Sequence, residues 1–366
     1  MKNLLKRSAP PIIEEDTFDI DKLHYIGIST GLTDVEVLTH EESGIALYFE
    51  TYVDGPALET EIEDGRFEVK VKERNRNQGL FSINFSSARL QLTLPKAIAY
   101  NWEIRTGSGD VEISNIITES ISMRTGSGDI EAIRILSKQA QIIASSGDLS
   151  LKDSEVEKLS FETSSGEAKL KNISSDVIHG SASSGDVVVK NLHGKSLEIE
   201  TSSGEIELEK IIVDKASLRA NSGDIAADHL MVEETSVRTS SGIIDVRSFT
   251  GNVKAVSSSG DVAFSAVNEA VYDIETSSGD ITVELSSEQL NATIEARTKS
   301  GKIETNLPLQ LERQAKDRLE GIIGSGENPI ILKARSGDIK FYRQIEWADK
   351  KERYFLICLH SLYRNW

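Results

Sequence analysis

The chain has 366 residues, a net charge of −18 and one cysteine, Cys358. The acidic excess argues against binding to nucleic acid, whose phosphates attract clustered Lys and Arg. A single cysteine excludes an intramolecular disulfide. No stretch is apolar over the roughly 20 residues that a bilayer span needs, so no membrane span is expected.

The N-terminal part of the chain divides into two segments. Residues 1–17 are polar and are predicted to be flexible. They contain basic side chains but no apolar run of signal-peptide length, which predicts cytoplasmic localisation, with cell-envelope or surface association as the alternative. Residues 18–95 show strand-like alternation without a fixed period, and we expect an N-terminal β cap, because a solenoid needs atypical ends to cover its open strand edges.

A Ser-Gly-Asp motif then recurs from Gly109 to Gly337 at a nearly constant step. Twelve glycines carry it; their first seven intervals are all 19 residues, and the later ones are 18, 19, 22 and 36. A fixed period near 20 residues is typical of stacked units rather than of one globular core. The sequence therefore predicts an all-β solenoid (a β-helix) of about twelve 19-residue coils, regular over residues 96–303.

Each unit has the pattern of two strands joined by a tight turn. Apolar and polar residues alternate on both sides of the motif, as in residues 197–208, and this period of two predicts one buried face. Glycine suits a turn residue with positive φ. We therefore assign a structural turn to Ser108, Gly109, Asp110, Gly128, Asp129, Gly147, Asp148, Gly185, Asp186, Gly204, Gly223, Asp224, Gly279 and Asp280.

An acidic residue follows ten of the twelve glycines, the exceptions being Ile243 and Lys302. Coils roughly 4.8 Å apart would make these acids a ladder of repelling charges. Each Asp can offset the repulsion by accepting backbone amides of its own turn. A Ca²⁺-binding edge is the alternative, because hard cations prefer carboxylate oxygens, but the nine-residue repeat of Ca²⁺-binding β-rolls is absent. We expect a structural column, with no metal and no cofactor.

Two further readings concern the outer surface. Paired carboxylates flank the sugar bond in glycoside hydrolases, but a whole column of acids predicts repetition rather than one cleft, so no catalytic residue is assigned. Four residues before their glycines stand basic side chains that form a candidate interaction face, with charge pairing across coils as the alternative: Arg105, Arg124, Arg219 and Arg238.

The C-terminal part departs from the regular period. Residues 304–343 are expected to form a capping coil or hairpin, with a charged insertion at residues 309–319 that the pattern leaves open between a short helix and a long loop. Residues 321–334 have the pattern of a hairpin before the last Ser-Gly-Asp. Residues 344–366 are predicted to be an irregular tail.

Together these features resemble a bacterial family of β-strand-repeat proteins called "putative adhesin", of unknown function. The resemblance covers residues 18–343 and is carried by Leu92-Thr-Leu-Pro95, the iterated Thr-Ser-Ser-Gly-Asp-Ile units and the closing Gly324-Ser-Gly, Ile330-Ile-Leu-Lys and Ser336-Gly-Asp-Ile339. It implies a β-solenoid, an adhesion or envelope-related role and no known catalytic residues.

We therefore expect a non-enzymatic interaction or scaffold protein linked to the bacterial cell envelope or its stress response. Its expected partner is a protein or an envelope polymer, and not nucleic acid. The chain is expected to be a monomer or a weak homo-oligomer. The alternative function is a carbohydrate-active β-helix enzyme that acts on an envelope polysaccharide.

Overall fold

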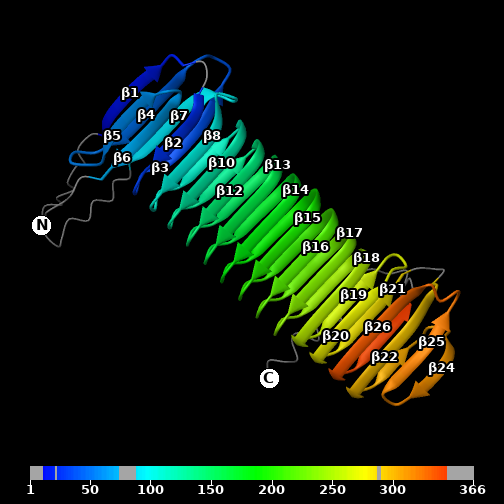
Figure 1. Ribbon diagram of the computed structural model, residues 1–366. Coiled ribbons are helices and arrows are strands. Elements are labelled where there is room, and N and C mark those ends of the chain that lie inside the picture. The colour runs from blue at the N-terminus through cyan, green and yellow to red at the C-terminus, as the bar shows by residue number, and fades with distance from the viewer. Residues whose placement is uncertain (1–10, 21–22, 74–87, 287–289, 344–366) are drawn as a thin grey trace, which may run out of the picture.

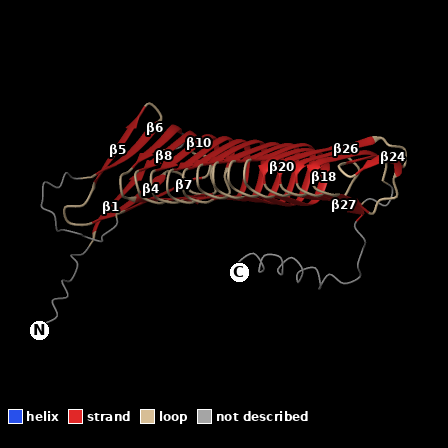
Figure 2. Ribbon diagram, turned by 90° about the horizontal axis from the view of Figure 1, so that it is seen from below, coloured by secondary structure: helices blue, strands red, loops and turns tan. Residues whose placement is uncertain are grey.

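The protein is an elongated rod of strands that run across its long axis (Figure 1). The computed structural model describes residues 11–20, 23–73, 88–286 and 290–343. Within these ranges every regular element is a strand (Figure 2), and the predicted all-β solenoid is confirmed. Most of the segments predicted as a flexible N-terminus and an irregular tail, residues 1–10 and 344–366, lie outside the described residues.

Long strands that each contain most of one coil form the middle of the rod. They are β13 (Leu149–Thr163), β14 (Ala168–Ala182), β15 (Val187–Thr201), β16 (Ile206–Ala220), β17 (Ile225–Thr239) and β18 (Ile244–Ser259). Each pairs in parallel with the next at an offset of 19 residues, so that Ile206 lies opposite Ile225. The repeat period is therefore the length of one turn of the solenoid.

Shorter strands flank this middle part and continue the same parallel stacking. On the N-terminal side they are β8 (Ala99–Thr106), β9 (Val111–Ser114), β10 (Ile117–Thr125), β11 (Ile130–Ile133) and β12 (Leu136–Ala144). On the C-terminal side they are β19 (Val262–Ala266), β20 (Tyr272–Ser278) and β21 (Ile281–Leu285).

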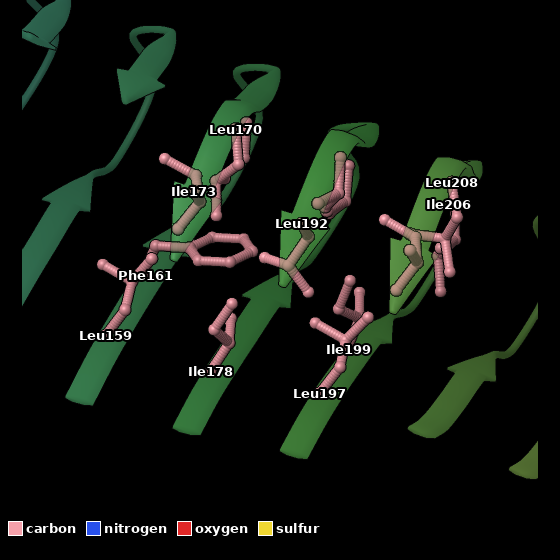
Figure 3. Close-up of a cluster of buried hydrophobic side chains, with 14 of the residues drawn as sticks. Leu159, Phe161, Leu170, Ile173, Ile178, Leu192, Leu197, Ile199, Ile206 and Leu208 are labelled. Carbon is pink, nitrogen blue, oxygen red and sulfur yellow. The ribbon is translucent and has the colours of Figure 1, made fainter. Parts of the chain in front are cut away.

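The buried positions follow one pattern in each coil, and this pattern explains the length of the repeat. In β16 the inward residues are Ile206, Leu208, Ile211, Val213, Ala216, Leu218 and Ala220. Strict alternation is broken twice by one extra outward residue, after Leu208 and after Val213, and at these points the strand bends around the core. Figure 3 shows the resulting stacks, with Leu159, Ile178 and Leu197 from successive coils.

The first bend contains a residue in the left-handed backbone conformation, six positions after the corner glycine. Its column is Asn115, Arg134, Asp153, Asn172, Asn191, Lys210, His229 and Ser248, with φ between 52° and 61°. Asn and Asp tolerate this conformation better than other L-residues. Their side chains also connect the coils, since the Asn191 amide donates to Asn172 Oδ1 at 2.9 Å, and the Asn172 amide donates to Asp153 Oδ1 at 2.6 Å.

One inward position shows that neighbouring coils share volume. Gly180 occupies a column that holds Phe161 in the coil before it and Ile199 in the coil after it. A Cβ at Gly180 would collide with the Phe161 ring, because this ring reaches into the space of the next coil (Figure 3). The large side chain and the missing one therefore complement each other.

The N-terminal end combines one more coil with a set of closing strands. Its strands are β1 (Ile12–Phe18), β2 (Leu23–Ser29), β3 (Asp34–His40), β4 (Ile45–Thr51), β5 (Ala57–Glu63), β6 (Arg66–Lys72) and β7 (Arg89–Pro95). β2 and β3 stack in parallel on β8 and β9. Outside them lie β6 and β7, and antiparallel β5, β4 and β1 complete the sheet. Residues 12–17, predicted to be flexible, thus lie in a strand, because β4 offers them an edge.

The C-terminal end stacks its strands out of sequence order. Its strands are β22 (Ala292–Ser300), β23 (Ile303–Thr305), β24 (Gln310–Ala315), β25 (Arg318–Ile323), β26 (Asn328–Ser336) and β27 (Ile339–Arg343). β26 lies between β20 and β22 (Figure 1), and β27 lies between β21 and β23. The last coil of the sequence is therefore inserted before the preceding one.

The charged insertion is neither a helix nor a loop. β24 and β25 form an antiparallel hairpin, and β25 pairs with the outer edge of β22. The predicted hairpin at residues 321–334 is also wrong, because its second half is the parallel strand β26. The free edge of β22 explains both corrections, since its unpaired backbone groups are satisfied by strand pairing.

Candidate interaction surface

The Ser-Gly-Asp corner forms one edge of the rod, and its glycines are required by close approach of the backbones. A Cβ on Gly204 would lie under 3.0 Å from the carbonyl oxygen of Gly185 in the preceding coil, and the other glycines of the column meet the same obstacle. The expected positive φ is wrong for Gly204, whose backbone is outside the left-handed region. Glycine is needed here for space rather than for conformation.

The acidic column joins consecutive coils. Asp186 Oδ1 accepts the backbone amide of Glu205 at 2.8 Å, and the same bond from Asp110 reaches the amide of Asp129. We expected each Asp to accept amides of its own turn; the acceptor instead serves the coil that follows. A carboxylate that accepts such a bond is favoured in its ionised form, and the bond offsets part of the repulsion along the column.

The two glutamates change the local electrostatics of this column. Burial, and then the charges of Asp224 and Asp186, raise the pKa of Glu205 above its usual value. The carboxylate of Glu205, with one more methylene than Asp, makes no such bond to the amide of Asp224 within the described residues. Acidic repulsion in the ladder is therefore least compensated around Glu205.

Threonine hydroxyls support the same corner from inside. Thr201 Oγ1 accepts the backbone amide of Gly204 at 3.0 Å, and Thr239 Oγ1 accepts that of Gly242 at 3.0 Å. Both threonines are buried. The sequence indicated only that small residues are needed three places before the glycine, whereas the structure adds a hydrogen bond that alanine in the same column cannot make.

The four arginines of the candidate face form two neighbouring pairs. Arg105 lies opposite Arg124 in the adjacent coil, and Arg219 lies opposite Arg238. Arg105 forms an ion pair with Glu103, and Arg219 forms one with Glu200. Charge pairing thus accounts for one arginine of each pair, while Arg124 and Arg238 are exposed and form no ion pair among the described residues.

Along the corner the surface is only shallowly hollowed in mid-rod. A recess of about 270 Å³ lies beside Ser181, between Glu162 and Arg219. Within the described ranges no group of three or more His, Cys, Asp or Glu side chains is arranged to hold a metal ion. The same part of the chain contains no helix long and apolar enough to span a bilayer.

The geometry of stacked 19-residue coils agrees with a comparison against known families. A family model described as Toastrack DUF4097 matches residues 24–209 and again residues 175–341. The chain belongs to this Toastrack family. The resemblance to a family of β-strand-repeat proteins is thereby confirmed, and the two matches span the rod from β2 to β27.

Solved bacterial structures are similar to the Toastrack chain at low sequence identity. A "putative cell adhesion protein" from Clostridium sporogenes has 13% identity and a TM-score of 0.22, covering 92% of this chain and 100% of that chain. A "putative adhesin" from Parabacteroides distasonis has 10% identity and a TM-score of 0.40, covering 69% and 97%. A "putative lipid binding protein" from the same species has 14% identity and a TM-score of 0.29, covering 91% and 97%. No curated protein matches the chain.

Proposed function

We propose that the protein is a non-enzymatic interaction scaffold that binds a protein or polymer of the bacterial cell envelope along its rod. The observation that carries this proposal is the contrast between inward and outward positions. Inward positions and the corner repeat the same residue types from coil to coil, because the fold requires them. Outward positions differ between coils, and the fold does not explain their identity.

Two outward columns show this contrast. Eight residues after the corner glycine, Ile212 and Met231 are 43% and 48% exposed and lie opposite each other in neighbouring coils. The same two coils carry the arginine pair formed by Arg219 and Arg238. Adjacent exposed apolar and cationic pairs on an acidic rod suit recognition of a partner with complementary apolar and anionic groups.

The acidic column supports a structural role better than a catalytic one. Each Asp that accepts the amide of the next coil has one oxygen occupied and is favoured as the anion. A glycoside hydrolase needs one carboxyl group with a raised pKa that donates a proton to the leaving oxygen. A ladder of amide-bonded carboxylates does not supply this donor, and the relatives named above are called adhesion, adhesin or lipid-binding proteins.

Co-sedimentation with purified bacterial envelope fragments tests the proposal. The labelled full chain is expected to bind saturably and to be displaced by unlabelled chain. A variant with Arg219→Ser, Arg238→Ser, Ile212→Ser and Met231→Ser is expected to bind at least tenfold more weakly, and Lys158→Ser/Lys171→Ser serves as the control. Absence of saturable binding, or release of reducing sugar ends that a single carboxylate substitution abolishes, contradicts the scaffold function.

A further inference from the structure

The C-terminal end of the rod contains a cationic cavity that the inserted strand creates. Its volume is about 440 Å³, and it is lined by β20, β26, β22 and the start of β25. Five cationic side chains and two acidic ones, Glu275 and Asp317, line it. On a chain with a net charge of −18, this local excess of three positive charges is a marked departure from the rest of the surface.

The charges come from a position that is small or neutral elsewhere in the rod. Two residues before the corner glycine, the other ten coils have Gly, Ser or Asn, as at Ser202 and Asn221. The two exceptions are Lys299 in β22 and Arg335 in β26, and the strand register places them opposite each other. They are 36 residues apart in sequence, and only the insertion of β26 beside β22 makes them neighbours.

A second cationic pair lies next to the first. Lys333 is opposite Arg297 across the same two strands. Arg297 and Arg318 share Glu320 as an ion-pair partner. Among the described residues, Lys299, Lys333 and Arg335 form no ion pair, and these three cations face the cavity.

The fold alone does not explain this arrangement. Like charges directly opposite each other on neighbouring strands are destabilising, and serine at both positions would satisfy the repeat. Neighbouring strands place the cations about 4.8 Å apart, and alternate residues of one strand place them about 6.6 Å apart. This spacing suits a compact ligand with several anionic oxygens rather than one carboxylate.

We infer that this cavity is a binding site for a ligand carrying two neighbouring phosphate groups, such as a diphosphate. Arg335 offers paired N–H donors that match phosphate oxygens, and Lys299 and Lys333 act as point charges. A diphosphate carries about the charge that the cavity has in excess, and the cavity volume lies in the usual range of small-ligand sites, roughly 300–1,000 Å³. The site would stand whether or not the rod binds envelope fragments.

Calorimetry and thermal melts of the full chain with inorganic pyrophosphate test the site, with orthophosphate as the comparison. Pyrophosphate is expected to bind at least tenfold more tightly than orthophosphate and to raise the melting temperature with concentration, as ligand binding to the native state requires. Lys299→Ser/Arg335→Ser restores the residue type of the repeat. It is expected to melt at or above the native temperature without ligand and to bind pyrophosphate at least tenfold more weakly.

Lys158→Ser/Lys171→Ser removes the same charge from mid-rod and is expected to bind pyrophosphate like the native chain. If this control loses as much affinity as Lys299→Ser/Arg335→Ser, or if the native chain binds no pyrophosphate, the site is refuted. Phosphatidylglycerol vesicles distinguish the source of the phosphate. Vesicle binding that depends on Lys299 and Arg335 identifies a lipid headgroup, and pyrophosphate binding without vesicle binding identifies a soluble or polymer-borne phosphate; both results support the site.

Discussion

The middle of the rod and its C-terminal end use the same Ser-Gly-Asp corner, but they stack it in different orders. Between Gly109 and Gly279 each corner rests on the one that precedes it in sequence. At the C-terminal end Gly337 rests on Gly279, and Gly301 rests on Gly337. The corner therefore specifies how a coil docks on its neighbour, and it does not specify which coil that neighbour is.

The N-terminal end extends the same lesson to a coil without the motif. Thr33 takes the place of the glycine under Gly109, and Asp34 Oδ1 accepts the amide of Asp110 at 3.0 Å. Thr30 Oγ1 donates to the carbonyl of Thr33 at 2.9 Å. At this terminal corner no further coil approaches from outside at the same distance, so the space that only glycine leaves free is not needed.

The largest expected effect comes from a corner glycine in mid-rod. Gly204→Val places a branched side chain against the Gly185 carbonyl, and we expect a loss above about 4 kcal/mol or failure to fold. Gly321→Ala in the C-terminal hairpin meets Gln310 at 3.0 Å, and we expect about 1 kcal/mol. Denaturant melts of both variants measure the difference, and equal losses would mean that corner packing is not what distinguishes the rod from its end.

Removal of the N-terminal end has the next largest expected effect. Deletion of residues 1–95 uncovers β8 and β9, including Trp102, Ile104 and Val111, which are now at most 2% exposed. An open parallel edge invites strand addition, so the shortened chain is expected to form end-to-end oligomers in light scattering. Deletion of residues 1–19 removes only β1 and is the control. A shortened chain that stays monomeric with full β content would show residues 18–95 to be a separate domain.

A core substitution tests whether packing passes from coil to coil. Gly180→Ala drives a methyl group into the Phe161 ring and is expected to cost about 1–3 kcal/mol, whereas Phe161→Leu leaves a void that costs about 1–2 kcal/mol. The double variant is expected to cost less than the sum of the two, with a coupling above about 0.5 kcal/mol. Additive losses in equilibrium unfolding would contradict the shared volume.

The smallest expected effect concerns the acidic column. Because the pKa of Glu205 is raised in the folded chain, its proton is bound more tightly there than in the unfolded chain, and stability falls as pH rises above about 4.3. Glu205→Gln is therefore expected to raise the melting temperature at pH 7 by less than about 2 °C, with the gain vanishing below pH 4. Asp186→Asn, whose amide oxygen can still accept the Glu205 amide, is the control and should change little. A gain that persists at pH 3 would contradict the assigned cause.

Much of the rod was predictable from its sequence, because one period and one alternation fix every coil. The left-handed column was partly visible in Asn115, Asp153, Asn172 and Asn191, but Arg134 and Lys210 at the same position obscure it. The reason for the corner glycines was not predictable, since a close approach between coils leaves the same residue as a positive φ. The boundary expected between residues 95 and 96 remains a prediction, although β2 and β3 already stack as a coil.

The order of the C-terminal strands could not be read from the pattern. Ile294 of β22 and Ile330 of β26 lie in the same register beside each other, so both strands carry the alternation that fits the edge of β20. What separates them is the β24–β25 hairpin, which pairs with the other side of β22. The cationic cavity was missed for the same reason, because Lys299 and Arg335 are neighbours only in the inserted order.

The inserted coil has a consequence for synthesis of the chain. The ribosome releases β22 before β26, and at that moment the exposed edge of β20 matches β22 in register. A coil docked there would have to leave before β26 and β27 could take their place. The middle of the rod can grow by one coil at a time as it emerges, but its C-terminal end reaches the native order only after residue 343 has been made. Folding of this end is therefore post-translational, and its rate depends on how readily β22 gives up the edge of β20.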